Sequence, residues 1–113
     1  MTGPGIFRVI LHMEIEPGTG PDFERLWQDI ARAISTRSAN LGQWLFKEHG
    51  VEHSYYVVTD WSDEESFREF ELSAPHVRNR ERLGRYRRGG WMTTMRIVGQ
   101  AEASGAQTVP SAG

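Results

Sequence analysis

The side chains best suited to acid–base chemistry lie in the second half of the chain, just after a proline. His76 follows Pro75 at the expected start of a helix. An unperturbed histidine has a pKa of about 6.5, so His76 is a candidate general base near neutral pH. Arg80 and Arg82 follow on the same helix and are candidate donors to a developing oxyanion. These residue types are suited to proton transfer and to binding a negative charge.

Large aromatic side chains near the middle of the chain could form an apolar pocket beside that helix. Trp61 and Tyr55 share the alternation of Val57 along one expected strand, so all three should face the same side of a sheet. Phe67 and Phe70 lie on the helix that follows. An apolar pocket with a few polar groups is typical of a site for a flat aromatic ligand. Trp61 is therefore a candidate catalytic residue and the others are candidate substrate contacts; the alternative is that all five form ordinary core.

Asn40 and Trp44, which begin another expected strand, are further candidate substrate contacts. Asn40 could instead end the preceding helix, because asparagine tolerates left-handed backbone. Trp44 shares the alternation of Gly42 and Phe46, so it fits either a pocket wall or a contact between two copies of the chain.

Length, charge and missing residue types exclude several classes of function. A chain of 113 residues suits one domain. It has no cysteine, which excludes disulfides, thiolate zinc sites, iron–sulfur clusters and a cysteine nucleophile. The net charge of −2 argues against a nucleic-acid partner. No apolar run reaches the roughly 20 residues that cross a membrane, and the first residues lack the features of a signal peptide. We therefore expect a cytoplasmic protein without a membrane partner.

We expect neither a metal nor an organic cofactor. Glu48, His49, Glu52 and His53 lie close together in the sequence, but at a hairpin tip, which is a poor place for a closed metal site. No glycine-rich loop follows a strand in the context that a P-loop or dinucleotide site requires. The sequence thus gives no sign of a flavin, nicotinamide or nucleotide site.

Hydrophobic patterns predict four strands and three helical segments. A capping box over residues 62–65 should begin the second helix. Pro75 disfavours helical backbone at Ala74, so we expect a break there, and Gly89 and Gly90 should end the last helix. The expected strands are residues 6–16, 41–49, 53–61 and 91–98, and the expected helices are residues 21–37, 62–74 and 76–87.

This β-α-β-β-α-β order predicts an α+β fold of the ferredoxin-like type over residues 6–100. Residues 1–5 should be a flexible N-terminus, and the small, polar residues 101–113 should be disordered. One face of the sheet would take the helices. The other face would be too apolar to leave in water, so we expect a homodimer formed sheet to sheet. The apolar residues assigned to that second face are Ile6, Ile10, Tyr56, Val58, Met92 and Val98.

A strand that ends in tryptophan, a short acidic cap and a helix with two aromatics together form a recognisable segment. Residues 57–70, VVTDWSDEESFREF, carry this pattern. The segment resembles the antibiotic biosynthesis monooxygenase (ABM) superfamily, which implies a dimeric α+β barrel built from ferredoxin-like protomers. Residues 40–44 (NLGQW) and 89–95 (GGWMTTM) are similar to small proteins of aromatic polyketide and spore-pigment gene clusters.

The resemblance implies oxidation of an anthrone-like polycyclic aromatic polyketide without a cofactor. The substrate would lose a proton and its carbanion would reduce O₂ directly. Val57 departs from the quinone-forming members, which have asparagine four residues before the tryptophan. Heme-degrading members need an early-strand asparagine and a helix histidine, and the corresponding places here are Leu11 and roughly Arg80. Heme cleavage is therefore not expected, although His76 lies nearby.

Two other functions remain open. Residues 73–75 (SAP) and 81–86 (ERLGRY) are similar to tetracenomycin-type polyketide cyclases, which tend to have histidine where Ala74 stands. A cyclase would use the same pocket for aldol ring closure and aromatisation. Alternatively the chain could be a non-catalytic partner, because the arginine-rich residues 78–88 could attract an acidic acyl carrier protein or another tailoring enzyme.

Overall fold

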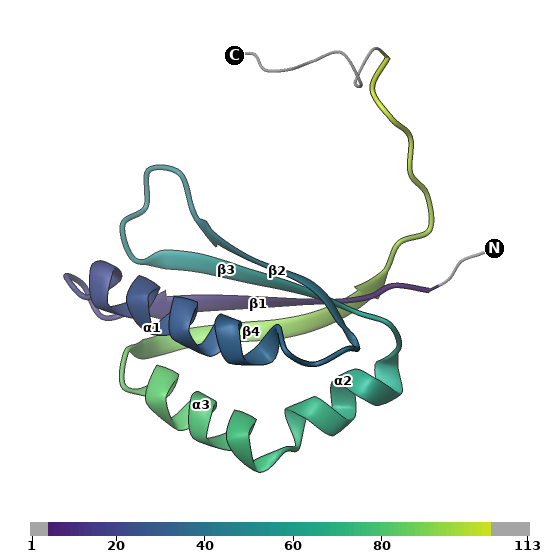
Figure 1. Ribbon diagram of the computed structural model, residues 1–113. Helices are drawn as coiled ribbons and strands as arrows, with labels where there is room; N and C mark the ends of the chain where they lie inside the picture. Colours follow the sequence, from purple (N-terminus) through teal and green to yellow (C-terminus); the bar gives the residue numbers. More distant parts are fainter. Residues whose placement is uncertain (1–4, 105–113) are drawn as a thin grey trace.

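Four strands form one antiparallel sheet in the order β2-β3-β1-β4, and three helices cover one of its faces (Figure 1). The structure is a computed structural model that describes residues 5–104. This arrangement confirms the predicted α+β fold of the ferredoxin-like type. The elements are β1 (Phe7–Ile15), α1 (Gly20–Ile34), β2 (Asn40–Lys47), β3 (Ser54–Trp61), α2 (Glu64–Glu71), α3 (Ala74–Gly84) and β4 (Arg87–Arg96).

The core lies between the sheet and the helices. Val9, Met13 and Ile15 alternate along β1 and are buried, because these side chains face the helices. One cluster of buried side chains surrounds Trp61 and a second surrounds Tyr55. The first cluster contains Val9, Ile30, Ile34, Trp61, Phe67 and Phe70, and the second contains Met13, Ile15, Phe23 and Tyr55.

The starts of α2 and α3 differ from the prediction. Asp63, and not Ser62, caps α2: its carboxylate accepts a hydrogen bond from the Ser66 N–H at 2.7 Å. Ser62 instead donates its hydroxyl to Asp63. The next helix begins at Ala74 after the N-cap Ser73, so Pro75 lies in its first turn and does not exclude Ala74. Proline is well suited to that position because the N–H it lacks has no partner within the helix.

The last strand begins four residues earlier than predicted and runs through the two glycines. Gly90 has a φ of 148° and lies so close to the His12 carbonyl oxygen of β1 that a Cβ atom would collide with it. Met92 pairs with Leu11 and therefore faces the helices, so its assignment to the opposite face was wrong. Trp91, paired with His12, is on that face instead. Val98 lies beyond the strand and is exposed.

The ends of the chain were predicted to be flexible. Residues 1–4 and 105–113 lie outside the described residues. Within the described part, residues 101–104 are exposed and form neither helix nor strand. None of the helices described is long and apolar enough to span a membrane.

Candidate functional site

A cavity of about 160 Å³ lies between the helices and the sheet, and every element contributes to its wall. Its polar wall residues are Gln43 and Thr59 on the sheet, and Glu71, His76 and Arg80 on α2 and α3. The remainder of the wall is apolar and consists of Val9, Leu11, Trp27, Ile30, Ile34, Val57, Phe67, Phe70, Leu83 and Met92. A few polar groups in an apolar hollow are typical of a small-molecule site.

His76 is held in the cavity wall by packing and by its place in the first turns of α3. Its ring lies 4.1 Å from the Phe70 ring, centroid to centroid, and the Asn79 amide nitrogen lies 3.4 Å from Nδ1. Burial, reinforced by the positive charge of Arg80, lowers the pKa of His76 to about 4. The imidazole is therefore neutral at pH 7 and has a lone pair that can accept a proton.

Arg80 brings a permanent positive charge to the same wall. Its guanidinium donates to the main-chain carbonyl oxygen of Glu71, the last residue of α2, at 2.9 Å. This bond ties α3 to the end of α2 and restrains the guanidinium beside the cavity. A charge held in this way can stabilise an anion without reorganising, which is the property an oxyanion site needs.

Trp61 does not reach the cavity wall. It is only 1% exposed and stacks on Phe70 at a centroid distance of 4.8 Å. Its indole N–H donates to the Thr59 hydroxyl oxygen at 2.9 Å. Both contacts are with residues of the wall, so Trp61 lies behind the site and supports it. Its predicted role as a catalytic residue in contact with substrate does not match this position.

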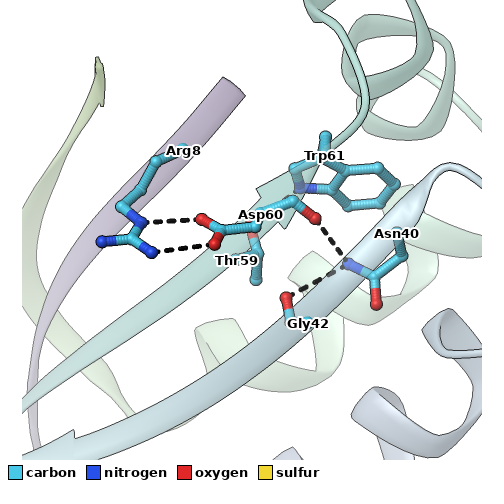
Figure 2. Close-up of polar contacts among 6 residues, drawn as sticks. All are labelled: Arg8, Asn40, Gly42, Thr59, Asp60 and Trp61. Atoms are coloured by element: carbon cyan, nitrogen blue, oxygen red, sulfur yellow. Dashed lines mark hydrogen bonds and ion pairs between the residues drawn. The ribbon is translucent and has the colours of Figure 1, made fainter. Parts of the chain in front are cut away.

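Asn40 has a structural role that the sequence did not indicate (Figure 2). Its side-chain amide donates to the main-chain oxygens of Asp60 at 3.3 Å and Gly42 at 3.4 Å. These bonds span the irregularity where the pairing of β2 with β3 shifts by one residue. The Arg8 guanidinium donates two hydrogen bonds to the Asp60 carboxylate, at 2.7 and 2.8 Å; Figure 2 also draws this pair. Asn40 does not line the cavity, so it is not placed to bind a substrate there.

Three other predicted substrate contacts also lie away from the cavity. Tyr55 belongs to the second core cluster and donates its hydroxyl to Glu24 at 2.6 Å. Burial, together with Glu24, raises the pKa of Tyr55 to about 12. Trp44 is on the opposite face of the sheet, where it is 43% exposed and lies beside Arg8. It is therefore not part of the wall of this cavity, and a contact between two copies stays a prediction. Arg82 is exposed on α3.

The structure thus brings together five of the predicted site residues, namely Val57, Phe67, Phe70, His76 and Arg80. Sequence reasoning missed Thr59, Gln43 and Glu71. Thr59 shares the alternation of Val57 and Trp61, so strand parity places it on the side of the helices, although it was not among the candidate site residues. Gln43, whose amide donates to the Ala31 carbonyl oxygen at 2.9 Å, depends on the pairing of β2, which spacing alone does not fix. Residues 5–104 contain no group of three or more His, Asp or Glu side chains that could hold a metal ion.

The fold closely matches those of several solved structures at low sequence identity. A putative antibiotic biosynthesis monooxygenase from Caulobacter crescentus has a TM-score of 0.77 and 15% identity, with 84% of this chain and 92% of that chain covered. SnoaB, a cofactor-independent oxygenase from Streptomyces nogalater, has a TM-score of 0.72 and 13% identity, with 88% and 97% covered. These likenesses concern the fold.

Two sequence comparisons add to this. A mycobilin-producing heme oxygenase from Mycobacterium tuberculosis is 33% identical over 55 residues, which are 49% of this chain. The aligned part spans about half of that relative, 52% of its length. The family model described as antibiotic biosynthesis monooxygenase matches residues 6–82, which is more than half of the chain. The chain therefore belongs to the antibiotic biosynthesis monooxygenase (ABM) family.

Proposed function

We propose that this protein is an oxygenase that acts on a phenolic substrate and uses no cofactor. The observation that carries the proposal is the presence of a neutral His76 and the guanidinium of Arg80 together in the wall of a mostly apolar cavity. Family membership and the fold shared with a cofactor-independent oxygenase support it.

In the proposed reaction His76 accepts the acidic proton of the bound phenol or of its tautomeric CH₂ group. Arg80 stabilises the negative charge that moves onto the substrate oxygen. This help is needed because a base with a pKa of about 4 is weak. The electron-rich substrate carbon then reduces O₂ and forms a bond to one of its oxygen atoms. When a CH₂ group becomes a carbonyl, that oxygen stays on carbon, and the second oxygen leaves as water with the two hydrogens.

The sequence predicted a polycyclic polyketide as the substrate. The cavity of about 160 Å³ is smaller than the roughly 300–1,000 Å³ of pockets that enclose drug-sized ligands. We therefore propose the broader class, phenols and their keto tautomers, and treat the polyketide as one member of it.

Heme is an alternative raised by the mycobacterial relative. Iron would need an accessible histidine nitrogen, and the macrocycle would need a far larger space than the cavity offers. Here the His76 ring packs on Phe70, and Leu11 presents an apolar side chain to the cavity. The residues as placed do not fit heme, and we assign it no step.

A cyclase is the second candidate, favoured by Val57. That wall position is apolar, so it offers no amide to an oxygen intermediate. The two reactions differ in the mass of the product, because the oxygenase adds oxygen and the cyclase removes water. Purified protein should be given an anthrone or a quinol, which only an oxygenase can convert, and separately an open-chain aromatic poly-β-ketone, which a cyclase can close, each with and without O₂. Product formation that requires O₂ supports the oxygenase, and equal turnover under argon with loss of water would establish the cyclase instead.

We also propose that the protein acts as a homodimer joined through the open face of the sheet. This face carries half-exposed apolar side chains from both outer strands, which are costly to leave in water. Its central residue His12 contacts the rings of Tyr56 and Trp91 at 4.6 and 5.5 Å. The side chains that a second copy would cover include Trp44, Phe46, Trp91 and Met95, which are 43%, 52%, 51% and 43% exposed.

A further inference from the structure

The size of the cavity limits the substrate more sharply than its chemistry does. We infer that the site binds a single aromatic ring with oxygen at both ends, a one-ring hydroquinone, and excludes fused polycycles. This inference deepens the proposed function and rests on it for the reaction, whereas the binding part can be tested separately.

The first argument is volume. The cavity measures about 160 Å³. An apolar cavity of about 150 Å³ in a protein core is known to take up one benzene molecule. The space between these helices and the sheet is therefore about that of one ring. The wall residues Arg80 and Met92 are exposed, so a second or third fused ring would have to project into water beside them or displace part of the wall.

The second argument is that the aromatic part of the wall is braced from behind. Phe70 lies between the Trp61 ring at 4.8 Å and the His76 ring at 4.1 Å. Phe67 is braced in the same way by Phe7 at 5.7 Å and by Trp61 at 5.6 Å. Protein interiors are close-packed, so rings held on two sides cannot retreat without moving the helix that carries them.

The sheet side of the cavity is equally rigid. Val9 and Val57 belong to the two central strands, each of which is hydrogen-bonded to a neighbour on both sides. A larger ligand enclosed wholly between the layers would therefore have to separate α2 and α3 from the sheet, and that would break the packing of the first core cluster.

The third argument is the arrangement of polar groups in two opposing layers. His76 and Arg80 belong to the helix layer, whereas Thr59 and Gln43 belong to the sheet. The Thr59 oxygen accepts the Trp61 N–H, which leaves the Thr59 hydroxyl hydrogen available to donate. A hydroquinone has an oxygen at each end of its ring, so one can meet His76 and Arg80 while the other meets Thr59. A buried polar group left without a partner is costly, which favours this pattern over a phenol with one oxygen.

The test is a matched series of one, two and three fused rings with the same para-dihydroxy pattern: hydroquinone, 1,4-dihydroxynaphthalene and 9,10-dihydroxyanthracene. Affinities are measured by calorimetry under argon, so that no substrate is oxidised. The Met92 methyl NMR signal reports on the cavity wall, and Met95, which pairs with Arg8 on the open face, is the reference. We expect hydroquinone to bind at least about tenfold more tightly than the larger compounds and to shift Met92 alone. Hydrophobicity by itself predicts the opposite order, because larger rings bury more apolar area.

A variant that enlarges the cavity sharpens the test. Trp27→Ala should admit the two-ring compound and bring its affinity to within a few-fold of that of hydroquinone. Trp44→Ala removes the same side chain from the open face and should leave the preference unchanged. Equal or tighter binding of the three-ring compound to the unmodified protein, or no binding of hydroquinone, would overturn the inference.

Admitting O₂ tests the proposed function separately. Oxygenation of hydroquinone gives 2-hydroxy-1,4-benzoquinone: one oxygen atom enters the ring, and the other leaves as water with two hydrogens of the substrate, which supplies all the electrons. The product mass therefore rises by one oxygen and falls by two hydrogens. Selective binding of hydroquinone without this product would contradict the proposed oxygenase and support the one-ring site. Oxygenation of the larger quinols alone would support the oxygenase and contradict the one-ring site.

Discussion

The indole nitrogen of Trp61 donates to the hydroxyl oxygen of Thr59, two residues earlier on the same strand, at 2.9 Å. Trp61 is buried, whereas Thr59 belongs to the cavity wall. The bond therefore connects the largest fully buried side chain of the core to a polar group that a substrate would meet. Because an occupied acceptor lone pair orients the hydroxyl, Trp61 also influences where the Thr59 hydrogen can point.

Replacing Thr59 by valine should destabilise the fold although the two side chains have similar shapes. The buried indole N–H would lose its acceptor, at a cost of about 1–3 kcal/mol in the free energy of unfolding. Thr36→Val, at an exposed position in the turn after α1, should change stability by less than about 0.5 kcal/mol. Denaturant titrations of both variants check this. Equal stability of the Thr59 variant and the unmodified protein would mean that the indole N–H has another acceptor.

His76 should make the protein less stable in mild acid. Its folded pKa of about 4 is below the unfolded value of 6.5, so between these values the unfolded chain binds a proton that the folded one does not. Stability from this residue is therefore fully present above about pH 6.5 and is lost as the pH falls towards 4. His76→Gln should make the decrease in Tm between pH 6.5 and 4 smaller. His49→Gln, at an exposed hairpin position, should leave that decrease unchanged. Parallel Tm curves for the unmodified protein and His76→Gln would contradict the depressed pKa.

Activity should depend on both proposed proton-transfer residues. His76→Gln should lower kcat/KM for a quinol about 10²- to 10⁴-fold, the usual contribution of a positioned general base. Arg80→Met should have a similar effect because it removes the charge that stabilises the anion. Arg78→Met removes an exposed arginine of the same helix outside the cavity wall and should leave kcat/KM unchanged.

The pH profile gives an independent check on the same residue. In the unmodified protein the acid limb of the kcat/KM profile should fall near pH 4 and not near pH 6.5.

If His76→Gln and Arg80→Met both keep full activity while circular dichroism shows an intact fold, the site assignment is wrong.

The open face of the sheet should determine the oligomeric state. Trp91→Glu places a charge among apolar side chains that a second copy would cover, so sedimentation should report a monomer in place of a dimer. Leu72→Glu is the control, because Leu72 is 76% exposed at the end of α2, away from the sheet. A monomeric unmodified protein would remove the homodimer from the proposal.

The sequence predicted the order of elements because the alternation in β1 and β3 and the helical spacing in α1 are local signals. It failed where a decision depended on pairing between strands. Met92 and Trp91 could not be assigned to faces until β4 was aligned with β1. Asn40 was a candidate substrate contact or the end of the first helix, yet its amide bridges the irregular pairing of β2 with β3.

The candidate site was partly predictable for the same reason. His76, Arg80, Phe67 and Phe70 lie on helices whose inner faces follow from spacing. Tyr55 shares strand parity with Val57, but it belongs to the second core cluster and does not line the cavity. Its position further along the strand, and not its parity, keeps it away from the site. Neither the depth of Trp61 nor the volume of the cavity could be anticipated, because both depend on how side chains from seven elements pack together.

The close approach of Gly90 to the first strand has a consequence for how this protein can change. Any side chain at that position would push the fourth strand outward or slide it by one place. A slide would exchange Trp91 with Met92, so the cavity wall and the surface proposed to contact a second copy would change in the same step. A substitution at Gly90 would therefore alter both surfaces of the strand together, whereas a substitution at Trp91 alone alters only the open one.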